Sequence, residues 1–217
     1  MAQQLIVEGN DAIALAELCR KRGLSPPLGY ASEAKFSQEF VKSGQGLNGA
    51  LEILREALDR NDLNNIGIIV DANDQGPTAR WQSIANILSA KYQPSSLLSS
   101  QRPSGSHIVR EDNMPTIGVW IMPNNHDNGY LEHFLSSLIE VSDPIWLHAQ
   151  STVTHLISQP FYVLTPAKQQ KALLHTWLSW QKDPGKPFGL AMKSGYFNVN
   201  AQTVEPLLEW FRETFEF

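Results

Sequence analysis

Residues 5–11 read LIVEGND, an apolar run that ends in a carboxylate, a glycine and a second carboxylate. A second apolar run ends similarly, because residues 66–74 read IGIIVDAND. Such runs are typical of buried strands in a parallel sheet. Carboxylates at the ends of two hydrophobic strands repel one another, and burial raises that cost, whereas a divalent cation such as Mg²⁺ relieves it through hard oxygen ligands. The two stretches therefore predict an acidic metal site at the carboxyl edge of a sheet.

Strand-like and helix-like segments alternate along the first two thirds of the chain. Apolar runs predict three long strands and two short ones, at residues 3–8, 65–71, 116–122, 28–33 and 107–110. Apolar side chains at helical spacing predict helices at residues 11–22, 47–60, 78–92 and 129–139. The Ser- and Pro-rich residues 93–106 are expected to form a surface loop. This alternation predicts an α/β fold with a mainly parallel sheet flanked by helices.

The pattern changes at Pro144, after which only helices are predicted, at residues 144–157, 166–181 and 202–215. We therefore expect an α/β core formed by residues 1–143. A helical extension, residues 144–217, is expected to pack on that core as part of one structural unit.

The composition limits the class of protein. Of 217 residues, 42% are hydrophobic, which is enough to form a core and too many for a disordered chain. No apolar run has membrane-spanning length, and the first residues lack the features of a signal peptide, so we expect a cytoplasmic protein. The single cysteine, Cys19, cannot form an internal disulfide, which fits a reducing compartment. A net charge of −5 argues against a generic basic nucleic-acid binder, but it does not exclude a nuclease with an acidic metal site.

The first acidic motif offers two candidate metal ligands. Glu8 is expected at the tip of a strand, and Asp11 opens the next helix after a turn at Gly9. Alternatively, Asp11 is only a helix N-cap and Glu8 an exposed strand end. The similar ending of the second strand favours the metal site.

The second acidic motif offers three more oxygen donors. Asp71 is expected at the strand tip, and Asn73 or Asp74 would add a neutral or a charged oxygen. The alternative is a turn in which side chains bond their own backbone, as Asp and Asn commonly do in loops. That alternative has more weight for Asn73 and Asp74 than for Asp71.

Together these motifs resemble those of the Toprim family. LIVEGND resembles the first Toprim motif, a strand followed by glutamate and glycine, and IIVDAND (residues 68–74) resembles the second, whose usual form is Asp-x-Asp. Residues 118–135, GVWIMPNNHDNGYLEHFL, look like a small bacterial group of Toprim-like proteins of unknown function. That group is similar to the OLD-type nucleases. With residues 186–197, KPFGLAMKSGYF, the resemblance covers the whole chain.

The resemblance implies roles for the acidic residues. Toprim domains bind magnesium through such acids and act on phosphodiesters. Glu8 matches the family's glutamate, a metal ligand or general acid–base, and Asp71 matches the first aspartate of Asp-x-Asp. Asn73 replaces the second aspartate, keeping an oxygen ligand but losing a charge, for which Asp74 could compensate. Asp11 matches an acid that helps to hold a second metal ion.

Two further residues are implied by the OLD-type relatives. Glu132 matches the glutamate of a Leu-Glu pair that supplies a metal ligand, although it could instead be a favourable charge near a helix N-terminus. Lys186 matches a C-terminal lysine that neutralises charge in the transition state, although it could be an ordinary loop lysine. The neighbouring His126 and His133 are expected to be surface histidines.

The leading hypothesis is a nuclease-like enzyme that uses Mg²⁺ or Mn²⁺ for phosphoryl transfer on DNA or RNA. Its catalytic residues would be Glu8, Asp71 and Lys186. Its metal ligands would be Glu8, Asp11, Asp71, Asn73, Asp74 and Glu132. The alternative is a non-catalytic Toprim-like module that binds a metal, a nucleotide or a protein. Other expected partners are a second copy of the chain or a protein of a defence system, and no membrane partner is expected.

Overall fold

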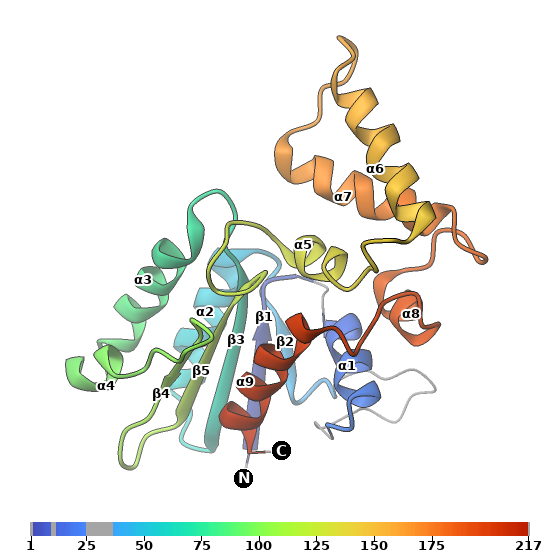
Figure 1. Cartoon of the computed structure of the whole chain (residues 1–217). Helices are drawn as coiled ribbons and strands as arrows, with labels where there is room; N and C mark the ends of the chain where they lie inside the picture. The colour runs from blue at the N-terminus through green and yellow to red at the C-terminus, as the bar shows by residue number, and fades with distance from the viewer. Residues whose placement is uncertain (1, 10–11, 25–36, 217) are drawn as a thin grey trace.

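The computed structural model describes residues 2–9, 12–24 and 37–216 (Figure 1). Its strands are β1 (Ala2–Val7), β2 (Val41–Ser43), β3 (Leu63–Asp71), β4 (His107–Val109) and β5 (Thr116–Met122). In the described part of the chain they form one five-stranded sheet in the order β2-β1-β3-β5-β4. All neighbours are parallel except β4, which runs antiparallel to β5. The predicted α/β fold with a mainly parallel sheet is confirmed.

Helices cover both faces of the sheet, because the strands are apolar on both sides. Ile68 and Val70 of β3 pack with α2 (Leu47–Leu58) and α3 (Gly76–Leu88). Ile69, between them, points to the other face, which α1 (Ala12–Lys21) and α9 (Glu205–Phe215) cover. This alternation follows from the two-residue period of a strand. The apolar runs thus fix which strands are central.

The remaining helices lie outside the two layers formed by α2, α3, α1 and α9 on the faces of the sheet. They are α4 (Pro94–Leu98), α5 (Leu131–Ser136), α6 (Pro144–Ile157), α7 (Pro166–Ser179), α8 (Phe188–Lys193) and the short 3-10 helix η1 (Gln202–Val204). Figure 1 shows that α6 and α7 project beyond the carboxyl end of the sheet, with α5 between α7 and the strands. None of the described helices is long and apolar enough to cross a membrane.

Some of the predictions for short elements were wrong. Residues 93–106 are not only a surface loop, because α4 lies within them and Ser100 and Ser106 are buried. Pro94 is compatible with helix there because proline suits a first turn. The short strand β2 and the short helix α8 were not predicted, since three to six residues carry little periodic signal. The predicted strand at residues 28–33 lies outside the described residues.

The last helix, α9, is part of the sheet core although it lies within the predicted extension. Its final turn packs on β3 and β5, and two amide side chains from the sheet bind its carbonyls. The Nε2 of Gln3 donates to the carbonyl of Phe215 (2.7 Å), and the Nδ2 of Asn65 donates to that of Thr214 (2.8 Å). The last carbonyls of a helix have no partner within the helix, so these contacts stabilise its end. Residues 144–217 therefore contribute to the core itself.

His107 on β4 should make stability depend on pH. It is buried, stacked on Trp81 (ring centroids 3.6 Å apart), and its Nδ1 lies 2.9 Å from the Oγ of Ser100. Burial lowers the pKa of His107 to about 4, whereas the unfolded chain takes up the proton near pH 6.5. The neutral folded form is therefore fully favoured above about pH 6.5, and the advantage is lost as the pH falls towards 4. Between roughly pH 7 and 4.5 we expect a loss on the order of 2 kcal/mol.

Urea unfolding of the wild type and of His107→Phe at both pH values measures the contribution of His107 to the free energy of unfolding. Phenylalanine keeps the ring against Trp81 but does not titrate, and all other groups titrate in both proteins. The stability difference between the two proteins should therefore shift in favour of His107→Phe at low pH. A difference independent of pH would contradict the assignment.

Candidate functional site at the carboxyl edge of the sheet

Glu8 and Asp71 meet at the carboxyl ends of two neighbouring strands. β1 and β3 are parallel and in register, with Val7 opposite Ile69, so both strands end at the same edge. The backbone N–H of Glu8 donates to the carbonyl of Ile69 (3.1 Å). The Oε2 of Glu8 accepts a hydrogen bond from the backbone N–H of Asp71 (3.0 Å). The structure thus brings together the two residues on which the sequence hypothesis depends.

Asp71 is held by contacts from three elements. Besides Glu8 on its N–H, its Oδ1 accepts a hydrogen bond from the N–H of Leu131, the first residue of α5 (3.1 Å). Its carbonyl accepts from the Nε of Arg80 on α3 (3.0 Å). Arg80 is buried and also donates to the Oε1 of Gln75 (2.9 Å). Strand, helix and buried guanidinium therefore fix this strand tip, and sequence reasoning did not identify Arg80.

The turn after β3 is joined to the loop before α5. Asn73 has a positive φ of 53° and its N–H donates to the carbonyl of Gly129 (2.9 Å). The Nδ2 of Asn128 donates to the carbonyl of Asp74 (3.2 Å), whose side chain is exposed. Asparagine is among the few side chains that tolerate a left-handed backbone. The geometry therefore gives Asn73 a conformational role in this turn.

Tyr130 lies among the acidic residues of this edge. The pKa of its hydroxyl is raised, first by burial and then by the negative charges of Asp74 and Asp71, with a smaller contribution from Glu132. The charge of Arg80 acts in the opposite direction. The three carboxylates thus share the surroundings of one phenol. Tyr130 was missed from the sequence, although its place directly before the Leu-Glu pair was a usable signal.

Glu132 faces α7 as well as Tyr130. Its side chain is 16% exposed, and its Oε1 lies 3.7 Å from the Nζ of Lys171. The neighbouring His133 was expected at the surface, but it is half-buried and its Nδ1 accepts the N–H of Tyr130 (3.2 Å). Burial lowers the pKa of His133, which favours the neutral ring that this bond needs. His126 is exposed, as expected.

Comparison with known proteins identifies the family. The family model described as "Protein of unknown function (DUF3226)" matches residues 2–216. The chain belongs to this family. The match runs from β1 to α9, so the family model covers both strand tips and the last helix, α9. No curated protein and no solved structure gives a match.

The structure does not bring Lys186 to this edge. Its Nζ lies 2.8 Å from the Oδ2 of Asp183 and donates to the Oγ of Ser194 (2.7 Å), over the ring of Tyr196. The bond to Asp183 raises the pKa of Lys186. Figure 1 shows the segment between α7 and α8 well away from the end of β3. The predicted catalytic position of Lys186 is therefore corrected to a local loop contact, and among the described lysines Lys171 lies beside Glu132.

The donor set can be compared with the needs of a metal ion. Asp11, a predicted ligand, lies outside the described residues. Within the described ranges, no three His, Cys, Asp or Glu side chains gather as a metal-binding group. Mg²⁺ is commonly held by one or two carboxylates and keeps several waters or substrate phosphates, whereas structural zinc needs four protein ligands. Glu8 and Asp71 therefore fit Mg²⁺ and do not by themselves fit zinc.

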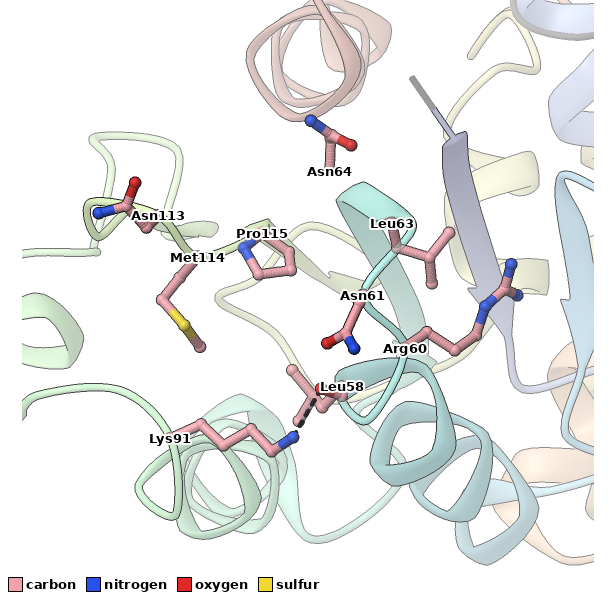
Figure 2. A pocket seen from close by; sticks show the side chains of 9 residues that line it. All are labelled: Leu58, Arg60, Asn61, Leu63, Asn64, Lys91, Asn113, Met114 and Pro115. Atoms are coloured by element: carbon pink, nitrogen blue, oxygen red, sulfur yellow. Dashed lines mark hydrogen bonds between the residues drawn. The ribbon is translucent and has the colours of Figure 1, made fainter.

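A pocket at the opposite edge of the sheet is separate from these carboxylates (Figure 2). It measures about 560 Å³ and lies among residues near the start of β3 and β5, including Leu63 and Pro115. The Nζ of Lys91 there donates to the carbonyl of Leu58 and to Asp59 (both 2.7 Å). The ammonium group of Lys91 thus ties the segment after α3 to the end of α2. The pocket is not part of the carboxyl edge.

Proposed function

We propose that the protein is a Toprim-like, magnesium-dependent phosphoryl-transfer enzyme that cleaves phosphodiesters of nucleic acid. The observation that carries this proposal is the hydrogen bond from the N–H of Asp71 to the carboxylate of Glu8. It places two acids at the tips of adjacent parallel strands, where ligands of open α/β sheets bind. The order of the motifs LIVEGND and IIVDAND in the sequence supports it.

The side chains of this edge have distinct parts in the proposed reaction. Glu8 and Asp71 would hold Mg²⁺, which when bound supplies a Lewis acid and lowers the pKa of a water nucleophile. The N–H of Leu131 and the guanidinium of Arg80 keep Asp71 in place, so that no reorganisation is needed when substrate arrives. Lys171, beside Glu132, contributes positive charge close to the path of the phosphates.

A non-catalytic module is the second candidate, and one observation favours it. Asn73 stands where Toprim enzymes carry their second aspartate, and here its positive φ and its bond to Gly129 serve the turn. Such a site would bind a metal ion or a nucleotide without turnover.

We also propose a cytoplasmic location. Cys19 is buried and burial raises its pKa to about 12, so it is an unreactive thiol suited to a reducing compartment.

Metal binding should stabilise the folded protein. Millimolar Mg²⁺ or Mn²⁺ at about ten times Kd adds about 1.4 kcal/mol, which raises Tm by about 3–6 °C. Glu8→Gln should abolish this shift, because it removes one charge and keeps an oxygen to accept the N–H of Asp71. Glu52→Gln, an exposed carboxylate on α2, is the matched control and should shift as the wild type does. Differential scanning fluorimetry measures all three, and equal shifts in the two variants would refute the site.

A further inference from the structure

The α6–α7 lobe, residues 144–182, differs in charge from the rest of the chain. It contains Lys168, Lys171 and Lys182, three of the six histidines, and no aspartate or glutamate. Its formal charge is therefore +3, or +1 when the flanking Asp143 and Asp183 are counted, in a chain whose total is −5. A local excess of positive charge on an acidic protein favours the approach of a polyanion at that surface. The lobe is the part of the protein to which a polyanion would be drawn.

Within the lobe, the basic side chains follow one face of α7. Lys168, Lys171 and His175 are spaced i, i+3 and i+7, which places them in one row, and all three are exposed. The Nζ of Lys171 lies 3.7 Å from Glu132 at the carboxyl edge. Burial is the main cause of the lowered pKa of His175. Lys171 lowers this pKa further, and Glu132 acts in the opposite direction. The middle of the row therefore lies beside Glu132, whereas its last member, His175, stacks on Phe188 of α8 (ring centroids 5.2 Å apart).

Exposed aromatic rings lie beyond both ends of α7. Phe161, in the connection from α6, is 71% exposed, and Trp180, directly after α7, is 41% exposed. Trp180 lies against His148 of α6 (ring centroids 5.2 Å apart). Isolated apolar side chains at a surface are common, but exposed rings on the same lobe as exposed lysines are the elements of single-strand binding surfaces. Cations contact the phosphates there, and bases stack on the rings. A duplex would not offer its bases for such stacking.

We propose that the basic row on α7 binds the phosphates of a single-stranded nucleic acid and leads the strand to Glu8 and Asp71. The inference rests on the proposed function for the direction of the strand, but binding itself needs no metal ion. It assigns this task to the projecting lobe, whose net charge is opposite in sign to that of the whole chain. DNA and RNA share the phosphate and base chemistry on which it depends.

Fluorescence anisotropy tests the proposal with labelled oligo-dT and oligo-U of about 20 nucleotides, in EDTA at about 50 mM salt. Lys168→Gln with Lys171→Gln should weaken binding about tenfold or more and reduce the slope of log K against log salt by about 1.4, since each phosphate contact on a single strand contributes about 0.7. Lys42→Gln with Arg55→Gln removes two exposed cations on β2 and α2 and is the matched control. It should bind within about twofold of the wild type.

The outcomes separate this proposal from the metal site. Equal weakening by both double variants, or a wild type that binds neither oligonucleotide, would overturn it and leave the exposed apolar side chains for a protein partner. Loss of binding only in the Lys168 and Lys171 variant supports it, even if Mg²⁺ gives no shift in Tm and the proposed enzyme activity fails. The oligonucleotide that the wild type binds more tightly identifies DNA or RNA as the ligand. Thermal melts confirm that each variant is folded.

Discussion

Glu8→Gln and Asp71→Asn should each lower Mg²⁺- or Mn²⁺-dependent cleavage of single-stranded nucleic acid by more than about a hundredfold. Loss of a mere supporting contact to a metal ligand commonly costs about 10–100-fold, so loss of a ligand charge should cost more. Both changes retain an oxygen where the structure needs an acceptor. An amide at position 8 could still accept the N–H of Asp71, and an amide at position 71 could still accept the N–H of Leu131. The substitutions therefore remove charge while leaving the shape of the strand tips intact.

Single-turnover cleavage of a labelled oligonucleotide, with Glu52→Gln as control, measures this effect. Glu52 is an exposed carboxylate on α2, so the control changes the net charge equally without touching the carboxyl edge. Cleavage that survives in both site variants would exclude the proposed roles. A wild type whose Tm rises with Mg²⁺ but which cleaves neither DNA nor RNA would favour the non-catalytic module.

The meeting of Glu8 and Asp71 was predictable because it needs only that two parallel strands are neighbours, as β1 and β3 are. Apolar runs identify buried strands, buried strands in an α/β fold are parallel, and parallel neighbours end at one edge. The turns beyond the strand ends were less predictable. The position of Asn73 depends on a bond to Gly129, more than fifty residues away in the sequence. No local pattern specifies that partner.

The lysine at the site could not be chosen from the sequence for a similar reason. Lys186 was selected by resemblance, but Asp183 at i−3 was available to bind it locally, and does. Lys171 lies in an ordinary amphipathic pattern, and only the packing of α7 against α5 brings it to Glu132. Arg80 is a comparable case, because a charged residue on a helix is expected to face solvent and this one is buried against Asp71. Tertiary packing decides the positions of Lys171 and Arg80, whereas a local ion pair decides that of Lys186.

The surface on which α9 packs was also not predicted, although two glycines in the strands indicated it. Its amphipathic pattern predicts a helix with one buried face but not the surface that receives it. Gly67 and Gly118 are paired across β3 and β5, on the face that α9 covers. Glycine inside a strand often marks the close approach of another element. Here that element is the last turn of the chain.

Gly118→Ala should destabilise the protein by at least about 3 kcal/mol, or about 6–12 °C in Tm. A Cβ at this position would lie 2.0 Å from the Oγ1 and 2.5 Å from the Cγ2 of Thr214, so α9 would have to move off the sheet. Movement would also break the bond from Asn65 to the carbonyl of Thr214, leaving a buried amide without its acceptor. Urea unfolding followed by tryptophan fluorescence reports this directly, since Trp210 is buried on α9.

Thr214→Gly in the Gly118→Ala background shows whether the loss comes from this contact. Glycine costs about 1 kcal/mol in a helix, but it removes every Thr214 atom that the new Cβ would meet. The double variant should therefore be more stable than Gly118→Ala alone, a non-additivity expected only for residues in contact. Thr214→Val supplies the control: the buried Oγ1 has no hydrogen-bond partner among the described residues, so its loss should cost little. Simple additivity of Gly118→Ala and Thr214→Gly would mean that the glycine is needed for another reason and that α9 does not depend on it.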